Sequence, residues 1–310
     1  MNDVSLALAA GETLALVGES GSGKTMLALA LMRLLPPGAR IRGEARLATN
    51  GNAANLAALA DEEMRHLRGR AQAMIFQEPM TALNPVMRVG AQIEEAVRVH
   101  QPGIDRREAH RRTIEALTRA AVPEPEARAR QYPHQLSGGL RQRAMIAMAL
   151  ASGLDGASRS LRLLIADEPT TALDVTVQKQ ILELLARLQN ELGMALLFIT
   201  HDLGVAAQIA QRIAVMYAGR IVEQGPAERV LRAPLHPYTQ GLLRAAPRLA
   251  SRKLEPIPGS VPQLQVLPPG CAFEPRCAVR RDECRVAVPE MRPATPGHAA
   301  RCILVEEVKM

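Results

Sequence analysis

Short apolar runs alternate with amphipathic segments along most of the chain. Residues 175–192 repeat apolar positions at the spacing of a helix. Five shorter apolar runs are bounded by polar or turn residues, as buried parallel strands are. The pattern therefore predicts an α/β fold with strands at 13–17, 73–76, 161–166, 195–200 and 212–217.

The pattern changes between residues 87 and 150, where the strand signal vanishes. This stretch is typical of several helices, and Pro and Gly break it at 101–103 and 122–125. We expect a helical insertion, about 87–150, inside the α/β core.

The composition changes again after about Leu231, where prolines become frequent and all four cysteines follow. Closely spaced prolines disfavour both helices and central strands. The sequence therefore predicts one main domain, residues 1–232, followed by a separate C-terminal extension, residues 233–310, with little regular structure.

Composition limits the kind of protein this can be. The 310 residues are 47% hydrophobic, yet they contain only six aromatic side chains and no Trp, so we expect a core of Leu, Ala, Ile, Val and Met. Purely apolar runs such as 194–199 are far shorter than a membrane span, and no basic region precedes the first apolar residues as in a signal peptide. These features predict a cytosolic chain. The net charge of +7 permits contact with nucleic acid or an anionic membrane, but the Arg residues are scattered.

The segment GESGSGKT fits G-x-x-x-x-G-K-[ST], the phosphate-binding P-loop. Its glycines let the backbone curl so that N–H groups face phosphate oxygens. Its Lys reaches the β- and γ-phosphates, and its Thr hydroxyl can ligate Mg²⁺. The loop follows an apolar strand and opens an apolar helix at 26–35, whose N-terminus favours anions. We expect ATP to bind at Gly18, Glu19, Ser20, Gly21, Ser22, Gly23, Lys24 and Thr25.

Two adjacent acids, Asp167 and Glu168, end the apolar run that begins at Leu163. A buried strand that delivers Asp167 beside a P-loop can hold Mg²⁺ through the carboxylate or its water. Glu168 is then placed to orient and polarise the attacking water, since phosphoryl transfer depends mostly on positioning and electrostatics. Solvated acids at the end of a strand are the alternative, and the P-loop makes that alternative weaker.

The segment LSGGLRQR, residues 136–143, predicts a second phosphate-binding site at the start of a helix that runs to about Leu150. Ser137 can cap the helix, and the N–H groups of Gly138 and Gly139 lie at the positive end of its dipole. One chain cannot use this site on its own P-loop. On sequence alone, an ordinary capped helix remains an alternative.

With these motifs in place, the chain resembles the ATP-binding subunit of an ABC transporter. LSGGLRQR matches the family's signature motif, with Leu140 where Gln is usual. The resemblance implies that Gln77 is the Q-loop glutamine, which senses Mg²⁺ and γ-phosphate and links to the membrane subunits. It also implies that Asp174 belongs to the D-loop, which crosses to the partner's site, and that His201 is the switch histidine that holds the γ-phosphate.

Narrower matches resemble the dipeptide/oligopeptide importer group: residues 76–85, 132–135, 167–174, 217–225 and 236–243. The fold implied is a RecA-like P-loop NTPase core with antiparallel β and helical subdomains and an irregular, Cys-containing C-terminal extension. The resemblance further implies a peripheral position on the cytoplasmic face of the inner membrane. The expected partners are a second, different ATPase subunit, two transmembrane permease subunits and, indirectly, a solute-binding protein, with no nucleic acid.

The chain departs from the family pattern at two places. The family has a first strand and an adenine-stacking aromatic residue well before the P-loop, and Lys24 lies too close to Met1 for either to fit. We therefore expect a late start or a trimmed chain. The link at 153–160 is longer and more polar than usual, which predicts a surface loop.

The four cysteines, Cys271, Cys277, Cys284 and Cys302, all lie in the last forty residues. Disulfides are disfavoured in a reducing cytosol, and zinc sites more often show C-x-x-C pairs. Four thiolates can ligate a [4Fe–4S] cluster, which the extension of this importer group carries in some members. A zinc site or free thiols remain the alternatives.

These features together predict an ATPase subunit that energises the uptake of short peptides through a dimer of two cassettes. A nickel or other small-solute importer is the alternative within the class. A soluble ABC ATPase acting on nucleic acid or ribosomes is the alternative from a different class, but the second cassette or long coiled coil of such proteins is missing from this sequence. A regulatory subunit without turnover would lack Glu168 or His201, and both are present.

Overall fold

The computed structural model describes residues 1–49, 52–78, 82–153, 160–246 and 256–305. The chain forms two compact units, and each is built from segments that are distant in the sequence. The first unit contains residues 1–8, 12–27 and 198–310, and the second contains residues 9–11 and 28–197. Two elements, α1 (Lys24–Leu31) and β6 (Ala195–Thr200), run from one unit into the other along the chain.

The first unit is built on a sheet with the strand order β1-β7-β8-β10-β9. Strand β1 pairs in parallel with β7, and the remaining strand pairs are antiparallel. All five residues of β1, TLALV, are buried, and four of the five are apolar. The strands are β1 (Thr13–Val17), β7 (Arg212–Tyr217), β8 (Arg220–Pro226), β9 (Arg292–Thr295) and β10 (His298–Ala300).

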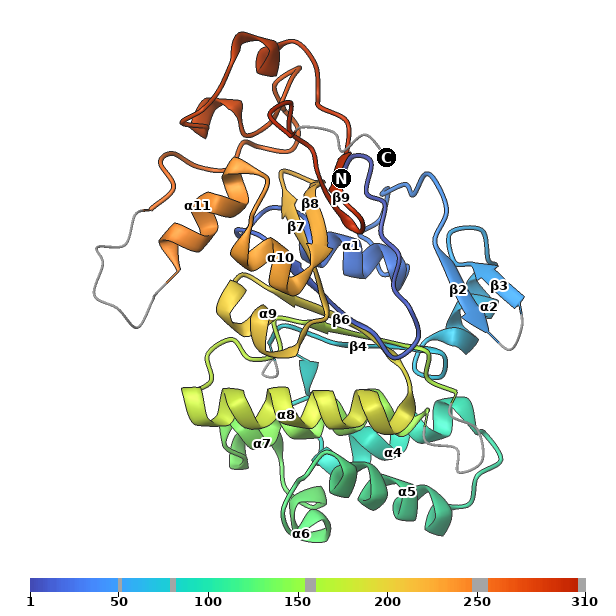
Figure 1. The fold of residues 1–310 in the computed structure, drawn as a ribbon. Helices are drawn as coiled ribbons and strands as arrows, with labels where there is room; N and C mark the ends of the chain where they lie inside the picture. The colour runs from blue at the N-terminus through green and yellow to red at the C-terminus, as the bar shows by residue number, and fades with distance from the viewer. Residues whose placement is uncertain (50–51, 79–81, 154–159, 247–255, 306–310) are drawn as a thin grey trace. The chain divides into compact units, whose positions relative to one another are not determined.

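Short helices accompany this sheet. Helix α10 packs beside β8 (Figure 1), and α9 packs beside β1. The helices of this unit are α9 (Leu203–Ile209), α10 (Ala227–Arg232) and α11 (Pro237–Ala245), with 3₁₀ turns η2 (Glu274–Arg276) and η3 (Asp282–Arg285).

The second unit combines a parallel strand pair, a β-ribbon and a helical region. Strand β4 pairs in parallel with β5, and β2 pairs with β3 in an antiparallel ribbon. Helices α4, α5 and α7 pack against one another (Figure 1). The strands are β2 (Arg46–Thr49), β3 (Asn52–Asn55), β4 (Gln72–Ile75) and β5 (Leu163–Asp167). The helices are α2 (Asp61–Leu67), α4 (Val89–His100), α5 (Arg106–Arg119), α6 (Pro125–Ala129), α7 (Gly138–Ala151) and α8 (Val175–Leu192), with the 3₁₀ turn η1 (Pro133–Gln135).

The elements with strong periodicity are confirmed. Strands β1, β6 and β7 and helix α8 have the predicted bounds, β4 and β5 are displaced by one or two residues, and the helical region at 87–150 contains α4 to α7. Helix α1 is shorter than the predicted 26–35. The sequence pattern missed β2, β3, β8, β9 and β10. Most of the link predicted as a surface loop at 153–160 lies outside the described residues.

The C-terminal extension has more regular structure than the sequence pattern predicts. It contains α11, and its strand β10 pairs with β8 of the preceding segment. Such a pairing joins residues far apart in the sequence, so a periodicity scan does not detect a strand of three residues. The predicted boundary between residues 232 and 233 stays a prediction.

Aromatic side chains form a cluster in the first unit, although the sequence predicts an aliphatic core. The ring of Tyr217 lies 4.6 Å from Tyr238 and 5.3 Å from Phe273, measured between ring centroids, and the latter two are 5.4 Å apart. Half of the six aromatic residues of the chain are therefore concentrated where α11 and the Cys-containing segment pack on β7.

Candidate functional site

The P-loop connects β1 to α1 in the first unit, as predicted. Gly21 and Gly23 have φ values of +79° and +107°, which glycine adopts without the steric cost of a Cβ. A Cβ at Gly18 would lie only 2.2 Å from the carbonyl oxygen of Met216, so no larger residue fits there. The sequence folds this way locally because each of these glycines meets a separate backbone requirement.

Lys24 lies over the loop that precedes it. Its Nζ donates hydrogen bonds to the carbonyl oxygens of Gly18 at 2.8 Å and Glu19 at 3.0 Å, and the residue is only 5% exposed. The ammonium group is thus held at the centre of a curled loop, where an anionic phosphate group would gain both its charge and its hydrogen bonds.

His201 follows β6 directly and belongs to the first unit. The next residue, Asp202, caps α9 by accepting hydrogen bonds from the N–H groups of Gly204 and Val205 at 2.6 and 3.3 Å. His201 itself is exposed at the strand end. The cap therefore fixes the backbone from which the imidazole projects.

The predicted acids lie at the end of β5 in the second unit. Asp167 and Glu168 are both buried, and Glu168 has a φ of +45°, a left-handed conformation that is rare for residues other than glycine. Glu168 Oε2 accepts hydrogen bonds from Thr171 Oγ1 at 2.9 Å and from Gln77 Nε2 at 3.3 Å. The structure thus brings two predicted catalytic residues, Glu168 and Gln77, into direct contact.

The signature segment starts α7 in the second unit. Ser137 is the N-cap of this helix, and its hydroxyl accepts a hydrogen bond from the N–H of Leu140 at 3.4 Å. A Cβ at Gly139 would lie 2.7 Å from a methyl group of Val177 on α8, so this close packing requires glycine. Ser137 is exposed at the positive end of the 14-residue helix, where another molecule can reach it.

Asp174 caps α8, since its carboxylate accepts a hydrogen bond from the N–H of Val177 at 2.9 Å. The next residue, Val175, is an apolar side chain that is 84% exposed. Asp174 is exposed as well, so both side chains at the start of α8 are open to solvent.

The predicted residues are therefore distributed between the units. The first unit holds the P-loop and His201, and the second holds Gln77, Asp167, Glu168, Ser137 to Gly139 and Asp174.

Three residues that support these sites were missed by the sequence analysis. Tyr238 Oη accepts a hydrogen bond from the N–H of Glu19 at 2.8 Å, and the guanidinium group of Arg276 contacts the carboxylate of Glu19 at 2.8 and 3.1 Å. They lie 219 and 257 residues from Glu19 in the sequence, so no local pattern connects them. Thr171, three residues after Glu168, could have been found from its spacing.

The four cysteines line one small cavity in the first unit, together with His236 and Phe273. None of them is in a disulfide, and Cys284 and Cys302 are buried. Burial, with a smaller contribution from the neighbouring thiols, raises the pKa of Cys271 to about 11. Within the described residues, no group of three or more His, Cys, Asp or Glu side chains is placed to hold a single metal ion.

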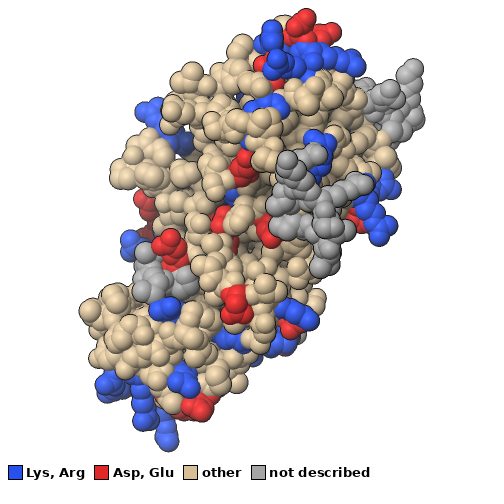
Figure 2. Space-filling view, turned by 90° about the vertical axis from the view of Figure 1, so that its left-hand side faces the viewer, with Lys and Arg blue, Asp and Glu red and all other residues tan. Residues whose placement is uncertain are grey.

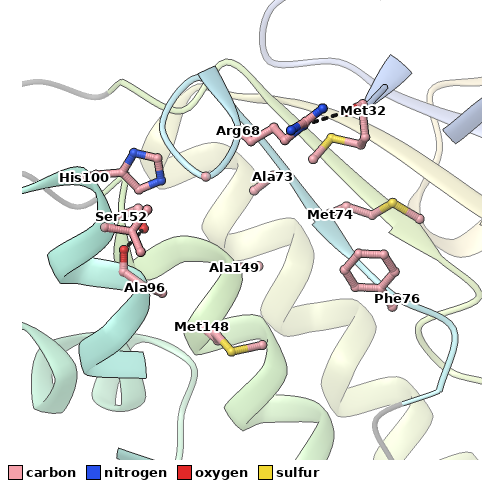
Figure 3. Close-up of a pocket in the computed structure, with 12 residues that line it drawn as sticks. Met32, Arg68, Ala73, Met74, Phe76, Ala96, His100, Met148, Ala149 and Ser152 are labelled. Carbon is pink, nitrogen blue, oxygen red and sulfur yellow. Dashed lines mark hydrogen bonds between the residues drawn. The ribbon is translucent and has the colours of Figure 1, made fainter. Parts of the chain in front are cut away.

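An open, largely apolar groove of about 260 Å³ lies in the second unit (Figure 3). Its apolar side chains come from β4, α4 and α7 and from Met32 and Phe76, which follow α1 and β4, and Arg68 and His100 supply polar groups. Arg68 Nε donates to the carbonyl oxygen of Met32 at 2.7 Å, which fixes that guanidinium group. The lining residues are Met32, Arg68, Gly69, Ala73, Met74, Phe76, Ala96, Val99, His100, Met148, Ala149 and Ser152.

Surface charge gives no sign of a nucleic-acid site on the face drawn in Figure 2, where Lys and Arg form several small groups separated by acidic and uncharged residues. Along the parts of the chain that the structure describes, no helix has the length and apolar character needed to cross a membrane.

Comparisons with known proteins show which family the chain belongs to. The profile of the ABC transporter family matches residues 1–171, and that of the oligopeptide/dipeptide transporter C-terminal region matches residues 222–284. A putative peptide import ATP-binding protein of Brucella ovis is 52% identical over 99% of this chain and 92% of its own length. The oligopeptide transport ATP-binding protein OppD of Mycobacterium tuberculosis is 48% identical over 96% of this chain. The match covers 47% of the length of OppD.

A solved structure is also similar. It is a dimeric ATP-binding cassette in a post-hydrolysis state, bound to ADP and Pi, with a TM-score of 0.60 and 28% identity, over 73% of this chain and 89% of that one.

Proposed function

The chain belongs to the ABC transporter ATP-binding family and carries the C-terminal region of oligopeptide/dipeptide transporters, and from this premise we propose how its residues act. It is an ATPase subunit that energises peptide import. The observation that carries the proposed site is the hydrogen bond between Gln77 and Glu168 at 3.3 Å. Gln77 directly follows Phe76, which lines the groove, and Glu168 is the residue that we assign to the attacking water.

In the proposed site, the P-loop binds the phosphates of ATP and Lys24 neutralises the β- and γ-phosphates. Glu168 orients and polarises the attacking water, and His201 contacts the γ-phosphate. Thr25 and Asp167 supply the oxygen ligands that Mg²⁺ prefers. The ion would stabilise negative charge on the phosphate oxygens.

We propose that turnover needs two cassettes, because Ser137 to Gly139 serve the P-loop of a partner subunit. The exposed cap at Ser137 and the exposed Val175 support this. The isolated chain should bind ATP while its hydrolysis rate per subunit rises with protein concentration or on addition of the partner subunit. A rate per subunit that stays constant over a wide concentration range, without any partner, contradicts the proposal.

Ser137→Asp is the matched variant for this test. Aspartate keeps the cap of α7, so the helix stays intact, but it places a negative charge where the partner's γ-phosphate would bind. We expect unchanged ATP binding to the isolated chain and a strong loss of hydrolysis. Normal hydrolysis by this variant would remove Ser137 from the proposed site.

We propose that the groove of Figure 3 receives an apolar segment of a permease subunit, which would place the chain peripherally on the membrane. Phe76 in the groove precedes Gln77, and Gln77 contacts Glu168, so an occupant could act on the hydrolytic residue. Val99→Glu puts a charge in the groove at a residue that is 60% exposed. It should preserve ATP binding but reduce co-purification with the permease and peptide uptake in cells.

Val86→Glu is the control, because Val86 is 80% exposed and does not line the groove. Equal peptide uptake by the Val99→Glu and Val86→Glu variants would argue against the groove as the permease site.

We also propose a [4Fe–4S] cluster at Cys271, Cys277, Cys284 and Cys302. Four unpaired thiols around one cavity are the donor set that such a cluster takes. A bound cluster would fix the segment after residue 256. Protein purified without oxygen should be brown, with about four iron and four sulfide per chain.

The matched variant for the cluster is Cys284→Ser, which should lose the colour and the iron while ATP binding at Lys24 persists. Zinc without sulfide would support the zinc alternative instead. No metal in anaerobic preparations would contradict both.

A further inference from the structure

The P-loop carries a negative charge of its own. Glu19 is the second residue of the loop, and its side chain is about one third exposed. A carboxylate beside bound ATP would repel the triphosphate, since like charges at short range disfavour each other. The loop therefore needs a cation close to Glu19 if it is to bind a highly charged anion.

Arg276 supplies this cation from the C-terminal region. One of its terminal nitrogens donates to Glu19 Oε2 at 2.8 Å and the other to Glu19 Oε1 at 3.1 Å, which is the bidentate geometry of a strong ion pair. The Arg276 side chain is only 5% exposed, so solvent screens the pair weakly.

The guanidinium group is held by its own region before it reaches the loop. Its Nε donates to the carbonyl oxygen of Pro258 at 2.7 Å, and its terminal nitrogens also reach Ile257 O at 3.4 Å and Tyr217 Oη at 3.3 Å. Because these partners fix the planar group, little side-chain entropy is lost when it pairs with Glu19.

The backbone of Glu19 has a second support from the same side. Its N–H donates to Tyr238 Oη at 2.8 Å, and Tyr238 is fully buried within the aromatic cluster. Burial raises the pKa of Tyr238 well above its usual range, so the hydroxyl stays neutral. Both the side chain and the main chain of Glu19 are thus bound by residues that follow β8.

We infer that Arg276 is a positioning residue of the nucleotide site, which neutralises Glu19 and fixes the P-loop for ATP. The inference rests on the proposed ATP site and adds the C-terminal region to it. Since Cys277 follows Arg276 directly, the segment that carries the thiols also carries the cation that the P-loop requires.

The test is steady-state ATP hydrolysis by the full-length chain, compared at one fixed protein concentration between the wild type and four variants. Arg276→Gln should raise the KM for ATP about tenfold, the range expected for a lost hydrogen-bonded charge pair, with kcat within about twofold of the wild type. Glu19→Gln alone gives the KM of a loop that lacks the carboxylate, and the double variant is compared with it. The double variant Glu19→Gln/Arg276→Gln should return KM to within about threefold of the wild type, because no uncompensated carboxylate remains. Arg276→Lys keeps the charge but loses the two-nitrogen contact of the planar group, so its KM should lie between those of the wild type and Arg276→Gln.

Arg280→Gln is the matched control, since Arg280 lies four residues further on, is half exposed and pairs with Glu274 instead of the loop. Its KM should equal that of the wild type. An unchanged KM for Arg276→Gln, or a double variant no better than Arg276→Gln alone, overturns the inference.

A folding defect would lower kcat and the melting temperature of both Arg276→Gln and the double variant, and rescue by Glu19→Gln would then be missing. Failure of the proposed function itself is separate, because the wild type would then neither bind ATP nor hydrolyse it at high protein concentration or with the partner subunit present.

Discussion

The P-loop and the acid pair at the end of β5 are both recognisable in the sequence, but they are held in different ways. Glu168 is held by Thr171, three residues away, and by Gln77, which follows β4, the strand paired with β5. Glu19 is held by Tyr238 and Arg276, which follow it by more than 200 residues. The acid pair is supported by Thr171 beside it in the sequence and by Gln77 after the paired strand, 91 residues away, whereas the P-loop depends on the far end of the chain.

A sequence motif therefore identifies the reacting groups but not the contacts that position them. The P-loop is rich in glycine, so its backbone is free to adopt many conformations and gains order from outside contacts. The acid pair is the continuation of a buried strand and needs fewer contacts. Substitutions around the two sites should therefore affect different kinetic parameters.

The largest effect is expected at the acid pair itself. Glu168→Gln should leave ATP binding intact and reduce hydrolysis by roughly 10²–10³, the usual cost of losing one positioned catalytic contact. Single-turnover hydrolysis and equilibrium ATP binding, measured on the same preparation, separate the two quantities. Weaker ATP binding with normal turnover would reverse our assignment of roles.

A pH change should act on the support of the P-loop. Burial lowers the pKa of His236 to about 4, while the unfolded chain titrates near 6.5, so between these values only the unfolded chain takes up this proton. Stability from this group is therefore complete above pH 6.5 and is lost as the pH falls toward 4. At pH 5.5 the free energy of unfolding should be lower by about 1 kcal/mol.

Urea unfolding at pH 7.5 and 5.5 checks this, with His236→Asn as the reference. In the wild type, the N–H of Tyr238 donates to His236 Nδ1 at 3.1 Å. The side-chain oxygen of asparagine can accept the same hydrogen bond, but asparagine does not titrate. An equal loss of stability in the wild type and the variant would show that His236 is not responsible.

Removing one hydrogen bond near the acid pair should have a smaller effect. Thr171→Val keeps the shape of the side chain but deletes the hydroxyl that contacts Glu168. The net contribution of such a bond is about 1 kcal/mol, so hydrolysis should slow about fivefold at an unchanged KM for ATP. A change in KM alone would place Thr171 in the binding step.

Tyr238→Phe is the counterpart on the other side of the comparison. It removes the acceptor of the Glu19 N–H and nothing else from the aromatic cluster. We expect the KM for ATP to rise about fivefold or less, with kcat unchanged. If Tyr238→Phe and Thr171→Val changed the same parameter, the two sites would not be supported independently.

The reacting groups could be predicted from the sequence more completely than the residues that position them. The P-loop, Asp167, Glu168 and the cap at Ser137 follow from local spacing, and so does helix α8, whose apolar face repeats over five turns. The short strands β8, β9 and β10 were missed, because a strand of three to seven residues gains its stability from a partner elsewhere in the chain. Arg276 was missed for the same reason, since nothing near it in the sequence resembles a nucleotide site.

The composition also misled us about the core. Few aromatic residues imply an aliphatic interior, and this holds for β4, β5 and α8. In the first unit, however, Tyr217, Tyr238 and Phe273 gather in one place. A count of residues cannot show where the fold concentrates them.

The pairing of β1 with β7 has a consequence for synthesis of the protein. The N–H of Thr13 donates to the side chain of Gln211, 198 residues further along, and four residues of β1 pair with β7. At about 5–20 residues per second, a ribosome needs roughly 10–40 s to make the chain between them. During that time the segment Thr13–Val17 has no β7 to pair with. Chaperones that bind extended apolar segments can protect it during this interval.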